Sequence, residues 1–355
     1  MIDVRRRQIV IGTAAATGWL SARSLSAFLV IVGGLLGAPL QAGAQPQGSL
    51  AAGQTGHIEF QSLTVAGPLT VPRRVAAGLK PAVISGELTL PPGTGRIPAM
   101  VIAHGSGGVG EHNKAWARFF VANGIAAFIV DSFTGRGIVE TATNQELAQG
   151  GWSNAADAIK AMVLLATHPR IDPSKIGVIG GSRGGMVALY TAFEEFASGL
   201  ADSGQRFAVH FALYPFCGTR YVGIRLTGRP VHFLLGERDD YTPAWQCEEY
   251  AGSLLAQGVP IEVRTFRRAH HGYDRATPPA FLSNVQTAKN CNTEYDISKG
   301  VARRLPGREM MTREENLAYF RTCMIRGATV GGEPRALADV RAHVLAATKA
   351  LGWGP

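Results

Sequence analysis

The amino-acid sequence predicts an α/β fold with a mostly parallel central sheet that helices cover on both faces. Three observations lead to this fold class: short, continuously apolar runs, amphipathic segments between them, and turns rich in Gly or Pro. Continuous apolar runs are typical of strands buried on both faces, and strands that alternate with helices form parallel sheets. The chain has 355 residues, 46% of them apolar and 17% charged. It is long enough for one large domain with a sizeable core.

The strands are predicted from apolar runs and from alternating patterns. The segments at 57–65 and 82–91 come first and are expected to form an antiparallel start to the sheet. The run at 97–105 is continuously apolar, as expected of a strand buried on both faces. The remaining predicted strands follow in chain order at 125–133, 175–181, 207–215, 230–240 and 261–266.

Apolar residues at helical spacing predict the helices between these strands. The predicted helices lie at 114–124, 154–168, 184–197, 244–258 and 335–352. Residues 276–333 interrupt the alternation, because they hold two cysteines and many polar residues without clear periodicity. We interpret them as an insertion within a single domain that spans 57–355.

The first 44 residues are predicted to be an export signal. A basic stretch at 5–7 precedes an apolar run at 27–40, and residues 42–44 supply an Ala-x-Ala cleavage pattern. The basic stretch also resembles a twin-arginine signal, so the export route stays open, and an uncleaved membrane anchor is the alternative. Residues 45–56, rich in Gln, Gly and Ala, are predicted to be a linker. The processed protein is expected to be periplasmic or secreted, without a membrane span.

The charge and the cysteines narrow the class of protein. The net charge of +9 is mildly basic, but Lys and Arg form no clustered stripe, so nucleic-acid binding is not expected. Four cysteines in an exported chain predict two disulfides, Cys217–Cys247 and Cys291–Cys323, because each pair falls within one local region. Buried free thiols are the alternative. No Cys or His spacing predicts a metal site, no cofactor is expected, and the oligomeric state stays open.

The stretch GGSRG at 180–184 lies between a predicted strand and a predicted helix and matches the pattern G-x-S-x-G. In a nucleophile elbow, a strand turns sharply into a helix with the serine at the apex, and small neighbours are needed to avoid collisions. The helix N-terminus directs backbone N–H groups toward the nucleophile. A Gly-rich turn without chemistry is the alternative. Ser182 is therefore the candidate nucleophile.

A serine needs a base and an orienting acid, and the chain offers both after predicted strands. Asp239 and Asp240 stand at the C-terminal end of one predicted strand, and His270 and His271 come shortly after the next, in the order serine, acid, histidine. Active-site groups gather at the C-terminal ends of parallel strands. We predict Asp239 and His271 as the partners of Ser182, because His271 directly precedes a glycine that leaves its ring room. Asp240 and His270 are the alternatives.

The stretch HGSGGVG at 104–110 follows a buried strand and resembles a loop that supplies an oxyanion donor. We predict the backbone N–H groups of Arg183 and Ser106 as the two donors, with Gly107 as the alternative to Ser106. The same stretch also spells G-x-G-x-x-G, with Asp131 at the end of the next strand, which is the pattern of a dinucleotide site. His104 before the first glycine, two earlier strands and the export signal disfavour that interpretation.

Several motifs together resemble those of the dienelactone hydrolase family of α/β hydrolases. They are HGSGG, VDSFTGRG, HPRIDPSKIGVIGGSRGG, LLGERDDYTP and AHHGYD, within residues 83–275. The resemblance implies the α/β-hydrolase fold, the triad Ser182, Asp239 and His271, and hydrolysis of esters or lactones. Two features depart from the family's namesake enzymes. Those enzymes use a cysteine nucleophile and are compact and intracellular, whereas this chain has Ser182, an export signal and an insertion.

The sequence thus predicts an exported serine hydrolase that cleaves a small-molecule or polymeric ester through an acyl-enzyme on Ser182. A peptidase or amidase with the same triad and a non-catalytic binding protein on a hydrolase fold are the alternatives. Arg136 is expected to pair with Asp131 or with backbone; binding a substrate carboxylate is its alternative role. Four aromatic residues could line a pocket or pack in the core: Trp152, Tyr241, Trp245 and Tyr273.

Overall fold

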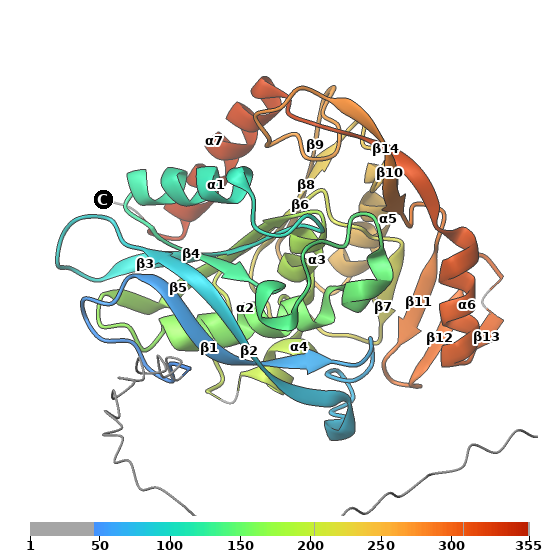
Figure 1. Cartoon of the computed structure of the whole chain (residues 1–355), viewed down its shortest axis with the longest axis horizontal. Coiled ribbons are helices and arrows are strands. Elements are labelled where there is room, and N and C mark those ends of the chain that lie inside the picture. Colours follow the sequence, from blue (N-terminus) through green and yellow to red (C-terminus); the bar gives the residue numbers. More distant parts are fainter. Residues whose placement is uncertain (1–45, 202, 308, 354–355) are drawn as a thin grey trace, which may run out of the picture. The chain divides into compact units, whose positions relative to one another are not determined.

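An eight-stranded, mostly parallel sheet confirms the α/β fold class (Figure 1). The computed structural model describes residues 46–201, 203–307 and 309–353, so the expected export signal at 1–44 lies outside the described residues. The strands of the sheet are β1 (Gly56–Val65), β2 (Leu79–Thr89), β3 (Ile97–Ala103), β4 (Ala126–Asp131), β5 (Ile171–Gly181), β6 (His210–Leu213), β8 (Val231–Gly236) and β9 (Ile261–Phe266). Their order is β1-β2-β4-β3-β5-β6-β8-β9. The pairs β1–β2 and β2–β4 are antiparallel, and the others are parallel.

Helices cover both faces of this sheet. The helices of the described residues are α1 (Glu111–Ala122), α2 (Trp152–Leu165), α3 (Arg183–Tyr190), α4 (Glu194–Leu200), α5 (Ala244–Leu255), α6 (Arg313–Cys323) and α7 (Pro334–Ala350). Of these, α6 packs against a second, smaller sheet. Short 3₁₀ turns are η1 (Ala76–Gly78), η2 (Thr134–Arg136) and η3 (Gln145–Gly151). Figure 1 shows α1 and α7 together on one side of the sheet, with α2, α3 and α4 on the other.

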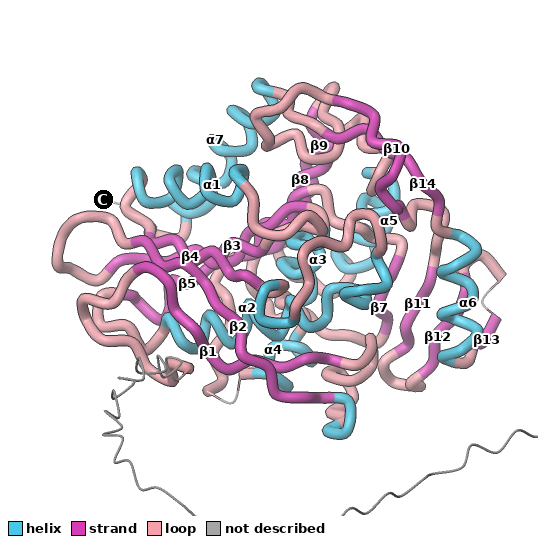
Figure 2. The backbone as a smooth tube through the Cα atoms, viewed as in Figure 1, coloured by secondary structure: helices cyan, strands magenta, loops and turns pink. Residues whose placement is uncertain are grey.

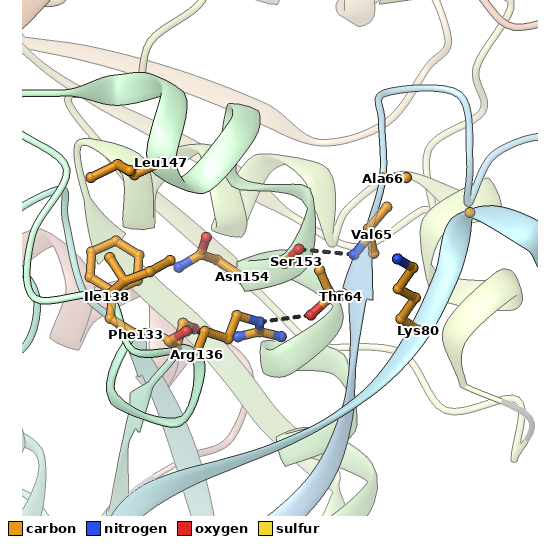
Figure 3. A pocket seen from close by; sticks show the side chains of 12 residues that line it. Thr64, Val65, Ala66, Lys80, Phe133, Arg136, Ile138, Leu147, Ser153 and Asn154 are labelled. Atoms are coloured by element: carbon orange, nitrogen blue, oxygen red, sulfur yellow. Dashed lines mark hydrogen bonds between the residues drawn. The ribbon is translucent and has the colours of Figure 1, made fainter. Parts of the chain in front are cut away.

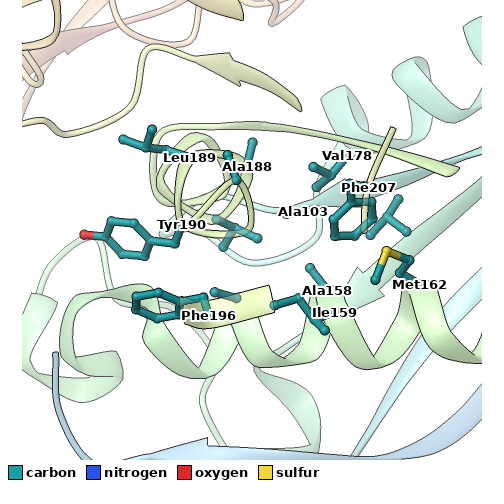
Figure 4. Packing of buried hydrophobic residues seen from close by; sticks show 14 of the residues in the cluster. Ala103, Ala158, Ile159, Met162, Val178, Ala188, Leu189, Tyr190, Phe196 and Phe207 are labelled. Atoms are coloured by element: carbon teal, nitrogen blue, oxygen red, sulfur yellow. The ribbon is translucent and has the colours of Figure 1, made fainter. Parts of the chain in front are cut away.

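Strand alternation divides the core between the two faces. On β3, Met100 and Ile102 pack with residues of α1 and α7, whereas Val101 packs with residues of α2 and α3. Both sets are apolar because both faces are covered, which explains the continuously apolar runs. Figure 4 shows the second face, where Ile159 and Met162 of α2 lie near the side chains of α3 and α4.

The predicted helix at 184–197 is wrong in one respect, because the structure has two helices there. The chain leaves the helix after α3, and the N–H of Glu194, the first residue of α4, donates to Arg225 O at 2.8 Å. The apolar spacing continues through the break because Tyr190, Phe193 and Phe196 all contact the ring of Tyr221. The pattern of apolar residues therefore indicates that these side chains are buried together, and it does not indicate one continuous helix.

Residues 276–333 contain more regular structure than their polar composition suggests (Figure 2). Strand β10 (Ala280–Thr287) pairs antiparallel with β14 (Ile325–Val330). A second sheet contains β11 (Thr293–Asp296), β12 (Val301–Arg304) and β13 (Glu309–Met311). Its fourth strand is β7 (Thr219–Val222), which was not predicted from the sequence. Because β7 pairs parallel with β11, this segment is joined to the body by backbone hydrogen bonds.

Both expected disulfides are present in the structure. Cys217–Cys247 joins the loop after β6 to α5, and Cys291–Cys323 joins the start of β11 to the end of α6. Upstream of β1, Leu50 is buried in the core and its N–H donates to Thr167 Oγ1 at 3.0 Å. Among the described residues, no helix is long and apolar enough to cross a membrane.

Candidate functional site

Ser182 lies at the sharp turn between β5 and α3, as its sequence context predicts. Its backbone has φ 59° and ψ −118°, a conformation that L-residues rarely adopt. The Ser182 N–H donates to Leu213 O of the neighbouring strand β6 at 2.9 Å. The turn therefore projects a half-buried serine at the C-terminal edge of the sheet.

The glycines around Ser182 are required by close backbone contacts. A Cβ atom on Gly180 would lie 2.6 Å from Ala103 O, and one on Gly184 would lie 2.2 Å from the same oxygen. A Cβ atom on Gly185 would lie 2.5 Å from Leu213 O. All three positions exclude larger residues because helix α3 begins directly against the backbones of β3 and β6.

Asp239 and His271 form a buried hydrogen-bonded pair. His271 Nδ1 lies 2.9 Å from Asp239 Oδ2, and both side chains are almost inaccessible to solvent. Asp239 Oδ1 accepts from the N–H groups of Tyr241 (2.9 Å) and Thr242 (2.8 Å). These bonds hold the carboxylate in one orientation, so that its second oxygen faces the imidazole.

Thr242 and Tyr214 surround this pair and were not predicted from the sequence. The Thr242 hydroxyl lies 3.1 Å from His271 Nδ1, 3.1 Å from Asp239 Oδ2 and 3.0 Å from Tyr214 O. The centroids of the Tyr214 and His271 rings lie 4.8 Å apart. Tyr214 directly follows Leu213 in the chain, and the Leu213 carbonyl accepts from the Ser182 N–H. The spacing Asp-x-x-Thr is a local signal for Thr242, whereas nothing local indicates Tyr214.

The loop that carries His271 is anchored at both ends. Asp274 accepts from Trp116 Nε1 at 2.9 Å and from the Tyr214 hydroxyl. The Gly331 N–H, just after β14, donates to His271 O at 2.9 Å. Gly272 has φ +71°, which permits the turn between these anchors. The segment 276–333 thus helps to position His271.

The alternative acid and base have other surroundings. Asp240 Oδ1 accepts from the Thr329 N–H at 2.7 Å, and its Oδ2 lies 3.2 Å from Thr329 Oγ1, so its carboxylate binds β14. His270 is half-buried, and its Nδ1 has no hydrogen-bond partner among the described residues. Ser182 makes no side-chain hydrogen bond within the described part of the chain, and His271 is not joined to it directly. Such contacts often tighten only when substrate binds.

The loop after β3 packs against the turn that carries Ser182. A Cβ atom on Gly105 would lie 3.6 Å from Ser182 Cβ. Ser106 is buried, and its Oγ lies 3.4 Å from Arg183 Nε, while Arg183 Nη2 donates to Gln145 Oε1 at 2.6 Å. The Arg183 side chain therefore braces this loop against η3. Burial lowers the pKa of Arg183 to about 10, a value still well above neutral pH, so the guanidinium remains charged.

His104 fixes the same loop to the end of β4. Its Nδ1 lies 2.7 Å from Gly105 O, and its Nε2 accepts from the Ser132 N–H at 3.2 Å. This pairing requires a neutral ring. Burial lowers the pKa of His104 to about 4 and that of His210, beneath α3, to about 3.

These two histidines predict a loss of stability in mild acid. Both pKa values lie below the ordinary 6.5. As the pH falls below 6.5, the unfolded chain binds protons that the folded protein does not, so the free energy of unfolding decreases. At pH 5 the loss is roughly 2 kcal/mol for each histidine, relative to pH 8. Denaturant unfolding at pH 8, 6 and 5 measures it.

Two variants isolate the contribution of His104. His104→Gln cannot titrate, so its unfolding free energy should depend less steeply on pH between 6.5 and 4 than that of the unchanged protein. His57→Gln, at an exposed position on β1, should keep the full dependence. Equal unfolding free energies of the unchanged protein at pH 8 and pH 5 would contradict the prediction.

Arg136 has a structural role and donates to backbone carbonyl groups, as expected, but its ion-pair partner is Asp157 and not Asp131. Its guanidinium donates to both Asp157 oxygens at 2.7 and 2.8 Å and to Ser132 O at 2.7 Å. Asp131 instead accepts from the N–H groups of Phe133 and Thr134 in its own turn. Asp157 lies on α2, so nothing local in the sequence indicates it as the partner.

A pocket of about 290 Å³ lies beside Arg136 (Figure 3). Residues of β1, η2, η3 and α2 contribute to its lining, and Figure 3 shows Arg136 bonded to Thr64 Oγ1 at its edge. Its lining includes none of Ser182, Asp239 and His271. The pocket is therefore a separate feature from the candidate nucleophile.

The four aromatic residues divide between the core, the surface and the site. Tyr273 is fully buried and its hydroxyl donates to Leu234 O, whereas Trp245 is 53% exposed. Trp152 is half-buried and packs against the core. Tyr241 contacts the candidate site directly, with its ring 4.4 Å from that of His271.

Comparison with known proteins places this geometry in a family. The model of the dienelactone hydrolase family matches residues 84–296, more than half of the chain. The chain belongs to the dienelactone hydrolase family. The matched range contains Ser182, Asp239 and His271, and membership supports an ester hydrolase. The resemblance seen in the sequence motifs is confirmed.

Solved structures similar to this dienelactone hydrolase family member include esterase 2 of Thermogutta terrifontis. Its apo form aligns with a TM-score of 0.44 and 19% identity, over 54% of this chain and 80% of that chain. Its butyrate-bound form aligns with a TM-score of 0.42 and 19% identity, over 59% and 85% of the two chains. The comparison with curated proteins finds no match.

Proposed function

We propose that this member of the family is an exported serine hydrolase that cleaves carboxylic esters or lactones through an acyl-enzyme on Ser182. One observation carries the proposal. The buried Asp239–His271 pair, joined at 2.9 Å, belongs to the same edge of the sheet as the strained turn that presents Ser182. A nucleophile, a base and an orienting acid in this order are the parts that acyl transfer needs.

The acylation step follows from the hydrogen bonds of the pair. With the Nδ1–H of His271 donated to Asp239, Nε2 is unprotonated and can remove the proton of the Ser182 hydroxyl. Oγ then attacks the ester carbonyl, and the imidazolium returns the proton to the leaving alcohol as the C–O bond breaks. Water, deprotonated by the same histidine, attacks the acyl-enzyme and releases the acid and free Ser182.

The oxyanion of the tetrahedral intermediate would be held by backbone N–H groups of Arg183 and Ser106. Arg183 is the first residue of α3, so its N–H group lies at the positive end of the helix dipole. The Ser182 N–H donates to Leu213 O, and the Arg183 N–H is the next backbone donor along the turn. Gly107, exposed on the loop after β3, is the alternative to Ser106 as the second donor.

The proposal includes the division of the chain predicted from the sequence: an export signal at 1–44, a linker at 45–56 and one hydrolase domain at 57–355 with an insertion at about 276–333. The two disulfides support a periplasmic or secreted location, because disulfides persist in oxidising compartments. Oxidation would also hold the inserted segment, since Cys291–Cys323 closes a loop within it.

A substrate panel and an active-site label test this function. We expect turnover of p-nitrophenyl acetate or butyrate, with lactones, polyesters and peptide amides as the other arms. A fluorophosphonate probe should attach to Ser182, as located by peptide mass mapping. Turnover of peptides alone would indicate a peptidase, absence of turnover and label together would indicate a binding protein, and a label on another serine would refute the nucleophile.

A further inference from the structure

Three side chains from separate elements converge on the face of the sheet beneath α7. His232 belongs to β8, Glu262 to β9 and His343 to α7. Both histidines are buried, with 8% of each residue exposed, while the Glu262 side chain is 41% exposed. The two histidines of this cluster are therefore shielded from solvent, whereas the carboxylate is partly exposed to it.

One atom of each residue faces a common point. His343 Nε2 lies 3.1 Å from His232 Nδ1, His232 Nδ1 lies 3.4 Å from Glu262 Oε2, and Glu262 Oε2 lies 3.8 Å from His343 Nε2. A circle through three atoms at these separations has a radius of about 2.0 Å. Zinc binds His nitrogen at about 2.0–2.1 Å and carboxylate oxygen at about 2.0–2.2 Å, so one ion can contact all three atoms.

A hydrogen-bonded cluster without an ion explains this arrangement less completely. One imidazole N–H can join the two histidines at 3.1 Å. The carboxylate oxygen, however, lies 3.4 and 3.8 Å from the two nitrogens, beyond the usual N–H···O distance of about 2.7–3.2 Å. Two histidines and one carboxylate form a ligand set that zinc sites use, with water in the fourth position.

Neighbouring groups hold two of the three side chains in place. The His232 ring stacks on the Phe211 ring, at 4.9 Å and 21°. Arg264 Nε donates to Glu262 Oε1 at 2.6 Å, which leaves Oε2 directed at the histidines. Carboxylate ligands of metal ions are commonly oriented by such outer contacts.

We propose that His232, Glu262 and His343 bind one divalent transition-metal ion, zinc in preference to magnesium or calcium. Imidazole ligands suit zinc, cobalt and nickel, whereas magnesium and calcium require oxygen ligands. The ion would link α7 to the β8–β9 edge of the sheet. His232 lies four residues before the end of β8, roughly 13 Å from the edge where Asp239 and His271 follow. The site is therefore structural and separate from ester hydrolysis.

Direct metal binding by the protein without an affinity tag tests this site. After removal of metals with a chelator, titration with Zn²⁺ should give one ion per chain, and Co²⁺ should give a visible absorption band typical of nitrogen ligands. Glu262→Gln and His343→Gln should each raise the Kd by at least about 100-fold and abolish the band. His57→Gln removes an exposed histidine of β1 and should change neither result.

A thermal-unfolding measurement provides the second readout. Zn²⁺ should raise the Tm of the unchanged protein and leave that of Glu262→Gln unaffected, while the kcat of both stays the same. Glu262 is the decisive position because its side chain is partly exposed, so its substitution leaves the core intact even if His343→Gln fails to fold. Binding that survives Glu262→Gln, or no binding of Zn²⁺ or Co²⁺ by the unchanged protein, would overturn the proposal.

Discussion

Replacement of Ser182 with alanine is expected to lower kcat for a p-nitrophenyl ester by at least about 10⁴-fold, because the bond to the acyl group forms at its hydroxyl oxygen. The neighbouring backbone should keep its shape, since alanine is smaller than serine and the turn is held by the Leu213 carbonyl. Substrate binding does not need the hydroxyl, so KM should change little. Steady-state kinetics with a burst-phase measurement checks this prediction.

Ser174→Ala is the matched control for this variant. Ser174 lies near the other end of the same strand β5, is exposed, and bonds only within its own turn through Asp172. Its substitution should leave both kcat and KM unchanged. If Ser182→Ala retained more than about a tenth of the original kcat in a preparation free of other esterases, Ser182 would not be the nucleophile.

Asp239→Asn is expected to lower kcat by about 10⁴-fold without unfolding the protein. Asp239 Oδ1 accepts from the N–H groups of Tyr241 and Thr242, so the amide oxygen of asparagine should take that position. The amide NH₂ would then face His271 Nδ1 and donate to it. The proton of the imidazole would move to Nε2, and the histidine could no longer accept the serine proton.

Asp240→Asn separates this effect from a general loss of charge at the same loop. Asparagine keeps an acceptor for the Thr329 N–H, so we expect kcat within about tenfold of the unchanged enzyme and a stability loss of about 1 kcal/mol. Parallel kinetics and denaturant unfolding of the two variants measure the contrast. Equal and mild losses of kcat in both would remove both carboxylates from the triad.

Local chemistry explains why the sharp turn at Ser182 and most of the sheet could be predicted. Gly180 and Gly184 are needed where the chain turns from β5 into α3, so the requirement and the residues lie within one short stretch. The same holds for Asp239 and His271, which lie three and five residues after the ends of β8 and β9. The strands of the sheet could be predicted because continuous apolar runs indicate strands that are buried on both faces.

Predictions that depended on distant partners were less complete. Arg136 pairs with Asp157 of another helix, and the break between α3 and α4 is concealed by aromatic residues that share one cluster. Within the segment 276–333, β10 pairs with β14, and β11 pairs with β7, which lies outside the segment. Their composition conceals these strands: β10 exposes five of its eight residues, and β11, although buried, consists of Thr, Glu, Tyr and Asp.

By itself, the sequence determined the α/β class, the strands of the eight-stranded sheet and the candidate residues Ser182, Asp239 and His271, because these depend on contiguous residues. It also favoured the two disulfide pairs that the structure has, because each pair falls within one local region. Only the tertiary structure decided that Asp239 and not Asp240 reaches His271. It also brought together the histidine–glutamate cluster beneath α7. These choices depend on side-chain directions and on contacts between elements far apart in the chain, which no local pattern encodes.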